Sequence, residues 1–158
     1  MSEKIKVILI EDEDGNRRSL TRALSKIGYE VSAFPSGEPA LVHLREHTDS
    51  ALIVTDLMMP GLDGFDVLRE SRQIVPEIGV LMITGHGSVE SAVDAMKNGA
   101  DDFLTKPVDL FELRKRASAI VEKRMLSRRV DELESRLFEI IFRFRNMPTL
   151  ASQKIMNY

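Results

Sequence analysis

Short apolar runs alternate with amphipathic segments through the first 108 residues of the chain. Five of these runs predict β-strands, at residues 6–10, 30–34, 51–55, 80–83 and 103–105. Apolar residues at helical spacing predict helices at 20–27, 37–46, 64–72 and 89–97, and a long helix that begins at Asp109. Strands that alternate with helices form a parallel sheet covered on both faces. The predicted fold class is therefore α/β, a doubly wound five-stranded parallel sheet.

Length and composition exclude several classes of protein. The chain has 158 residues, which fits one domain and a modest extension. It contains no cysteine, which excludes disulfides and thiolate metal sites. The N-terminus does not resemble a signal peptide, and no apolar stretch approaches the roughly 20 residues of a membrane helix. We expect a soluble, cytoplasmic protein that does not bind membranes.

Polar side chains follow four of the predicted strands. Glu11 and Asp12 follow the first, Asp56 the third, Thr84 ends the fourth and Lys106 follows the fifth. Ligands of doubly wound sheets bind beyond the carboxyl ends of the strands, so these side chains should converge. Burial of a lone carboxylate would cost several kcal/mol, roughly the effective desolvation penalty of an ion. We therefore expect Asp56 to be exposed at a site.

This set of groups suits phosphoryl transfer. Mg²⁺ takes one or two carboxylates, often beside a phosphate, and Asp12 and Asp56 offer such oxygens. A carboxylate can also attack phosphorus to form an aspartyl phosphate. Lys106 and Thr84 could then neutralise the phosphoryl oxygens with a charge and a hydrogen bond.

Three sequence runs carry a resemblance to a known family: "VILIEDED", "VTDLMMPGLDGFDVL" and "LMITGHGSVESAVDAMKNGADDFLTKP". Residues 4–122 resemble the receiver domain of two-component response regulators. The third run is most similar to receivers of NtrC-type enhancer-binding transcriptional activators. The resemblance implies a flavodoxin-like sheet order 2-1-3-4-5, and a phosphorelay protein that regulates transcription.

The resemblance also implies a role for each site residue. Asp56 would accept the phosphoryl group from a sensor histidine kinase, and Lys106 would contact it. Thr84 and Phe103 would form the switch that responds to it. Mg²⁺ would be bound by Asp12, Asp56 and the backbone carbonyl of Met58, with Glu11 acting through water. Glu11 departs from the family's usual Asp. The Lys106-Pro107 bond is expected to be cis.

Two other classes of function were weighed. Phosphohydrolases of the haloacid dehalogenase type place a second Asp two residues after the nucleophile, where this chain has Met58. A receiver-like binding module that is not phosphorylated would not need Asp56, Thr84 and Lys106 together. We therefore expect a switch and no turnover enzyme. Met58 has no group to orient water, which predicts a long-lived phosphoryl group, although His86 could take that role.

The C-terminal segment has a heptad pattern. Its apolar positions step by four and three residues: Leu126, Val130, Leu133, Leu137, Ile140, Phe144 and Met147. They predict a parallel coiled coil that joins two copies through residues 126–147, with a stutter near 121–126; a helix folded back on the receiver is the alternative. Residues 112–145 hold ten basic and six acidic residues in mixed order, which favours a solvated coil over nucleic-acid binding.

These patterns predict three parts: a receiver domain at residues 1–122, a helical coiled-coil linker at 123–147 and a tail at 148–158. The tail could begin a missing output domain, either the ATPase of an NtrC-type activator or an enzyme, or the output could be a separate protein. Two local expectations concern surface residues. His43 and His47 are predicted to lie on a solvated helix face, and Asp101-Asp102 in a solvated loop.

Overall fold

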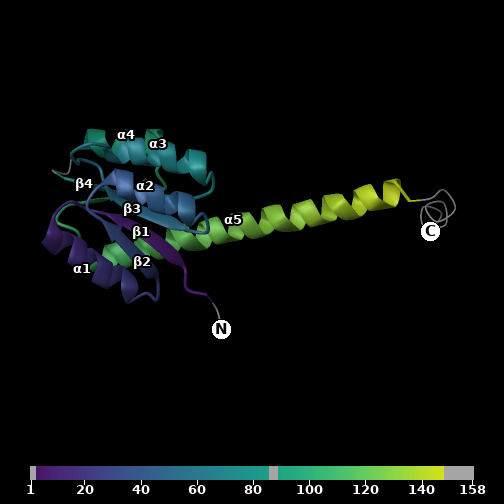
Figure 1. The fold of residues 1–158 in the computed structure, drawn as a ribbon, viewed down its shortest axis with the longest axis horizontal. Helices are drawn as coiled ribbons and strands as arrows, with labels where there is room; N and C mark the ends of the chain where they lie inside the picture. Colours follow the sequence, from purple (N-terminus) through teal and green to yellow (C-terminus); the bar gives the residue numbers. More distant parts are fainter. Residues whose placement is uncertain (1–2, 86–88, 148–158) are drawn as a thin grey trace. The chain divides into compact units, whose positions relative to one another are not determined.

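The computed structural model describes residues 3–85 and 89–147. His86 and the predicted tail at 148–158 lie outside these residues. The chain divides into two compact units, Met1–Arg124 and Met125–Tyr158. The strands are β1 (Lys6–Ile10), β2 (Glu30–Phe34), β3 (Leu52–Asp56), β4 (Gly79–Thr84) and β5 (Asp102–Thr105). The helices are α1 (Asp14–Ser25), α2 (Gly37–Glu46), α3 (Gly64–Ile74), α4 (Val89–Lys97) and α5 (Leu110–Arg145) (Figure 1).

The strands form one parallel sheet in the order β2-β1-β3-β4-β5, which confirms the predicted fold class and strand order. Each strand lies within one residue of its predicted bounds. The first helix is longer than predicted because its opening turn is polar. Glu13 caps it, and its carboxylate accepts hydrogen bonds from the backbone N–H groups of Gly15 and Asn16 at 3.0 and 2.9 Å.

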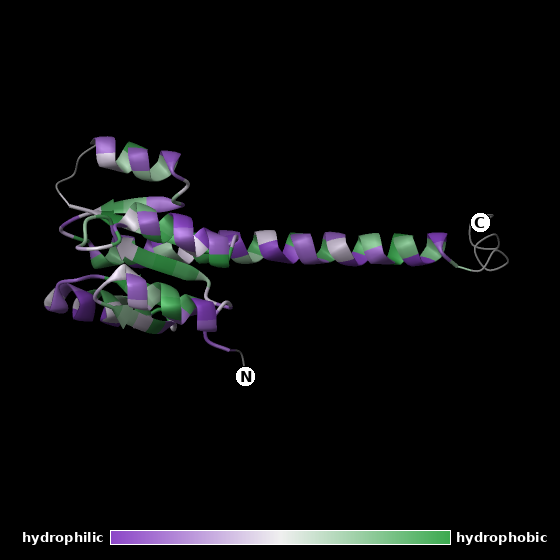
Figure 2. Ribbon diagram, turned by 45° about the horizontal axis from the view of Figure 1, so that its top comes forward, coloured by the Kyte–Doolittle hydropathy of each residue, from purple (hydrophilic) through white to green (hydrophobic). Residues whose placement is uncertain are grey.

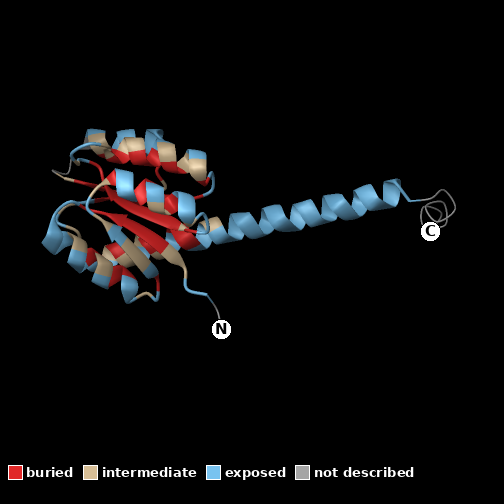
Figure 3. Cartoon of the chain, in the orientation of Figure 1, coloured by how far each residue is buried: buried red, intermediate tan, exposed pale blue. Residues whose placement is uncertain are grey.

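Helices cover both faces of the sheet, and each face has its own hydrophobic core. On β1, Val7 and Leu9 belong to the core under α1 and the first part of α5, whereas Ile8 and Ile10 belong to the core under α2, α3 and α4. Successive strand residues point to opposite faces, so strands buried on both faces need continuous apolar runs. Figure 3 shows that the central strands β1, β3 and β4 are buried, and Figure 2 shows that they are hydrophobic.

The turn after β3 holds the backbone close to the end of that strand. Gly61 has φ +81°, a left-handed conformation that glycine adopts without strain. A Cβ on Gly64 would lie 2.9 Å from the carbonyl oxygen of Asp56, so a larger residue would push α3 away from the strand end. Asp63 and Asp66 form a capping box that fixes the first turn of α3.

The prediction of a solvated loop at Asp101-Asp102 was wrong for Asp101. Its side chain is 12% exposed. One carboxylate oxygen accepts hydrogen bonds from Arg72 of α3 at 2.9 Å and from the backbone N–H of Val80 at 2.8 Å. The other accepts from Arg124 of α5 at 2.7 Å. Asp101 therefore joins three elements that are distant in sequence. Asp102 forms a more exposed pair with Arg116 at 2.8 Å.

The two histidines of α2 are half-buried, so the expectation of a solvated helix face is met only in part. The rings of His43 and His47 stack with their centroids 4.0 Å apart, and the ring of Phe34 on β2 lies 5.1 Å from His43. Burial lowers the pKa of His43, and the charge of His47 lowers it further.

Helix α5 contributes to the two units in different ways. Leu113, Ala117, Ile120 and Val121 are buried in the first unit. Residues 125–147 are exposed in the single chain, and they include every position of the predicted heptad seam. Among the described residues, no helix is both long enough and apolar enough to span a membrane.

Candidate functional site

Three acidic side chains meet at the carboxyl ends of β1 and β3. Glu11, Asp12 and Asp56 each present a carboxylate oxygen, and these oxygens lie within 4.8 Å of one another. Glu11 is fully buried and Asp56 is 3% exposed, whereas Asp12 is exposed. The parallel sheet brings them together because β1 and β3 are neighbours with matched register.

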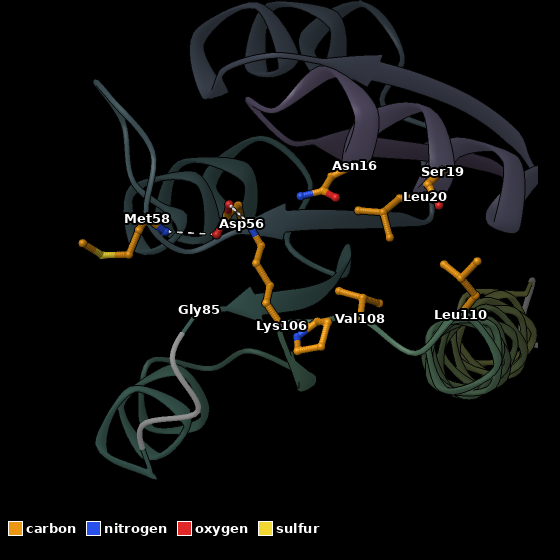
Figure 4. A pocket seen from close by; sticks show the side chains of 10 residues that line it. Asn16, Ser19, Leu20, Asp56, Met58, Gly85, Lys106, Val108 and Leu110 are labelled. Atoms are coloured by element: carbon orange, nitrogen blue, oxygen red, sulfur yellow. Dashed lines mark hydrogen bonds and ion pairs between the residues drawn. The ribbon is translucent and has the colours of Figure 1, made fainter.

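Lys106, which follows β5, supplies the positive charge. Its Nζ donates to Asp56 Oδ2 at 2.6 Å (Figure 4). It also lies 3.4 Å from Glu11 Oε1. The peptide bond between Lys106 and Pro107 is cis, as predicted. The expectation that Asp56 is exposed was wrong. Attraction to a paired cation offsets part of the cost of burying a carboxylate, and Lys106 is that cation here.

The charges in this cluster shift one another's protonation. Burial raises the pKa of Glu11, the negative charge of Asp56 raises it further, and Lys106 opposes both. Burial acts to lower the pKa of Lys106, but its hydrogen bond to Asp56 and the charges of Asp56 and Glu11 outweigh burial, so the pKa is raised. The cluster contains three carboxyl groups and one ammonium group, a composition that favours a further cation.

The remaining predicted site residues lie around this centre. Thr84 is buried at the end of β4, and its hydroxyl makes a long hydrogen bond of 3.5 Å to the carbonyl oxygen of Leu104. Phe103 is half-buried and packs on the core beneath α2, α3 and α4. The backbone N–H of Met58 donates to Asp56 Oδ1 at 3.3 Å, and the Met58 side chain is 74% exposed.

A pocket of about 740 Å³ opens beside Asp56 and Lys106. It extends between α1 and the start of α5, and Figure 4 shows its lining side chains. Its polar members are Asn16, Ser19, Asp56 and Lys106, and the others are Leu20, Met58, Gly85, Pro107, Val108 and Leu110. The Asp56 carboxylate thus lies at the wall of a pocket that is partly polar and partly apolar.

Sequence reasoning missed two side chains that support Glu11. Asn16 Nδ2 donates to Glu11 Oε1 at 3.4 Å, and Arg17 Nη1 donates to the carbonyl oxygen of Glu11 at 3.0 Å. Both lie in the first turn of α1, directly after the acidic run. A longer prediction for α1 would have placed them at the carboxyl edge of the sheet.

A comparison with models of protein families shows which family the chain belongs to. Residues 7–118 match the model of the response regulator receiver domain. The chain belongs to that family. The receiver domain of two-component systems was the family expected from the sequence, and neither alternative class gains support.

Relatives of this receiver include transcriptional regulators. It is 38% identical over 134 residues to the probable transcriptional regulator ycf27 of Porphyridium aerugineum, covering 84% of this chain and 52% of the relative. It is 34% identical over 126 residues to the C4-dicarboxylate transport transcriptional regulatory protein DctD of Rhizobium meliloti, covering 80% of this chain and 27% of DctD. The receiver thus spans about half or less of the length of these two relatives.

Solved structures agree with the fold. A response regulator receiver domain protein from Clostridium thermocellum superposes with a TM-score of 0.73 at 32% identity, covering 77% of this chain and 98% of that one. NtrX from Brucella abortus superposes with a TM-score of 0.77 at 32% identity, covering 83% of this chain and 30% of NtrX.

Proposed function

We propose that this receiver is a phosphorylation switch that accepts a phosphoryl group on Asp56 from a sensor histidine kinase. The observation that carries the proposal is the Asp56–Lys106 pair at 2.6 Å, at the wall of the pocket and beside two further acids. A carboxylate that lines a pocket can be reached by a phosphorylated group, and a paired cation balances its negative charge while it attacks phosphorus.

In the reaction, an oxygen of Asp56 attacks the phosphorus of a phosphohistidine. The bond between phosphorus and the imidazole nitrogen breaks, and its electron pair stays on nitrogen. Lys106 then neutralises part of the charge on the phosphoryl oxygens. Pro107 and Leu110 at the pocket rim offer apolar contact to the protein that presents the phosphohistidine.

The three clustered carboxylates fit Mg²⁺, because hard oxygen ligands surround a centre with excess negative charge. Asp12 and Asp56 would bind the ion directly, the Met58 carbonyl would add a ligand, and Glu11 would act through water. Bound Mg²⁺ would supply charge neutralisation for the phosphoryl oxygens. Asn16 and Arg17 position Glu11 for this role through the hydrogen bonds described above.

Thr84 and Phe103 form the proposed switch. The Thr84 hydroxyl holds Leu104 by only a long hydrogen bond, so a phosphoryl group on Asp56 could draw it away at low cost. Phe103 would then fill the space that Thr84 leaves. This would reshape the face formed by α4, β5 and α5, where Val93, Met96 and Phe111 are exposed. A coupling of about 1–3 kcal/mol would shift populations 5- to 150-fold.

The second part of the proposal is a parallel homodimer through residues 126–147, whose exposed seam supports it. Arg129, Arg136 and Arg143 all lie on one flank of the seam. In an antiparallel pair these arginines would lie opposite the same arginines of the partner helix and repel them. In a parallel pair each arginine lies beside the other flank of the partner helix, which favours the parallel arrangement. We retain the boundaries 1–122 for the receiver, 123–147 for the linker and 148–158 for the tail.

The output is proposed to be transcription regulation, which the transcriptional regulators among the relatives support. The switch would act in the cytoplasm on an output domain or partner protein. We propose that the chain does not turn over a substrate or bind nucleic acid directly.

Incubation with acetyl phosphate and Mg²⁺, followed by intact-mass measurement, tests the proposal. One phosphoryl group should add to the wild type and none to Asp56→Asn. A full adduct on Asp56→Asn would refute the assignment of Asp56. Steady phosphate release from simple monoesters would instead support a hydrolase.

A further inference from the structure

The distal part of α5 exposes more apolar surface than a two-helix seam can bury. Besides the seam residues, Phe138 is 70% exposed, Phe142 is 59% exposed and Ile141 is 46% exposed. Figure 2 shows hydrophobic bands on this part of the helix, and Figure 3 shows the same part fully exposed. All three side chains lie outside the heptad positions of the seam.

Helical geometry places these residues on one face. At 3.6 residues per turn, Ile141 lies beside the seam, and Phe138 and Phe142 lie farther around the helix. From Ile140 through to Phe142 the apolar arc spans roughly 200°, whereas a coiled-coil seam is narrower than about 100°. Pairing two helices through the seam would therefore leave both phenylalanines in water.

The seam itself changes character along the helix. The first core pair is Val130 and Leu133, a β-branched residue followed by leucine, which favours two strands. The next is Leu137 and Ile140, the reverse order, which favours three or four strands. The wide apolar arc begins at the same point. Two independent features therefore indicate that more than two helices meet beyond residue 137.

Charge on the outer face identifies the partner. Along this face, Glu134 comes first, then Phe138, Ile141 and Phe142, and then Arg145, all of them exposed. The order is acid, apolar, base, so the face complements a second copy of itself that runs in the opposite direction. Glu134 of one copy would then lie beside Arg145 of the other. Such self-complementary contacts are the rule in two-fold assemblies.

We propose that the outer face of residues 134–145 joins two dimers of this chain into a tetramer, with the contacting helices antiparallel. This inference rests on the proposed seam dimer. The two interfaces use different positions of the same helix, so substitutions can separate them.

Light scattering on the full chain over a range of concentrations tests the inference. The wild type should be a tetramer, and Phe138→Ser/Phe142→Ser should be a dimer. Leu133→Asp/Leu137→Asp/Phe138→Ser/Phe142→Ser, which lacks both interfaces, should be a monomer. Met125→Ser is the matched control, since Met125 is 52% exposed and lies outside both faces, and it should remain a tetramer.

Charge reversal tests the direction of the contact. Arg145→Glu should shift the assembly from tetramer to dimer, because the new acid would face Glu134 of the other pair. Glu132→Arg lies outside residues 134–145 and about 120° around the helix from Phe138, so it should leave the tetramer unchanged. A tetramer that survives Arg145→Glu overturns the antiparallel contact.

The outcomes separate the two proposals. A wild type that stays dimeric at high concentration overturns the tetramer and leaves the seam dimer standing. A monomeric wild type overturns both. A phenylalanine double variant that remains tetrameric overturns the outer face as the contact, provided that circular dichroism shows α5 retained.

Discussion

Loss of the Asp101 carboxylate should destabilise the first unit far more than loss of its neighbour, Asp102. Asp101 accepts a hydrogen bond from the backbone N–H of Val80, which is fully buried. It also accepts hydrogen bonds from Arg72 and Arg124, which lie on two different helices. Asp101→Ala removes all three contacts at once. Within residues 3–85 and 89–147, Asp102 has only the partly exposed Arg116 as its ion-pair partner, so Asp102→Asn serves as the matched control.

The magnitude follows from the individual contacts. An unpaired buried N–H at Val80 would cost about 1–3 kcal/mol. The arginine side chains are 24% and 26% exposed, so their pairs with Asp101 add up to roughly 1 kcal/mol each. Asp101→Ala should therefore lower the free energy of unfolding by about 2–4 kcal/mol. Asp101→Asn keeps an acceptor for Val80 and should cost about half as much. Asp102→Asn should cost below about 1 kcal/mol.

Urea denaturation provides the measurement, because the midpoint and slope yield the free energy of unfolding. The substitutions should be made in the Leu133→Asp/Leu137→Asp/Phe138→Ser/Phe142→Ser background, so that assembly does not contribute to stability. The expected order is Asp101→Ala, then Asp101→Asn, then Asp102→Asn, from most to least destabilised. If Asp101→Ala costs no more than Asp102→Asn, the reasoning about the Val80 contact is refuted.

Three further predictions concern pH, lifetime and metal. The pKa of His43 is lowered in the folded chain, so its neutral form contributes stability above about pH 6.5, and this stability is lost as the pH falls from there toward the folded pKa. His43→Gln should therefore show a smaller fall in urea midpoint on acidification than the wild type. Parallel curves for the two proteins would contradict this. Because the Met58 side chain cannot orient water, Met58→Asn should shorten the lifetime of the phosphoryl group in intact-mass time courses; an unchanged lifetime would count against this role. Mg²⁺ should raise the thermal midpoint of the wild type but not of Asp12→Asn, and equal shifts would rule out Asp12 as a ligand.

The sheet and the site were predictable because both depend on local patterns. Apolar runs define the strands, and parallel topology places their carboxyl ends at one edge of the sheet. The sequence alone therefore predicts that Glu11, Asp56 and Lys106 lie close together. The exposure of Asp56 was mispredicted because its burial depends on Lys106, fifty residues farther along the chain. The sequence places the two groups together but does not state how deeply they lie.

Asp101 was missed for a similar reason. Its partners Arg72 and Arg124 lie 29 and 23 residues away, on two different helices. An aspartate after Gly99-Ala100 is typical of a solvated loop when only its neighbours are considered. Whether Asp101 is paired depends on how α3 and α5 pack in the folded chain, and no local sequence pattern encodes that packing.

Peptide mapping after incubation with a phosphorylated histidine kinase locates the phosphoryl group. We expect a single phosphoryl group, carried by Asp56, whose formation requires Mg²⁺ and slows strongly in Lys106→Ala. A phosphoryl group on another residue, or transfer that proceeds equally well without Lys106, would contradict it.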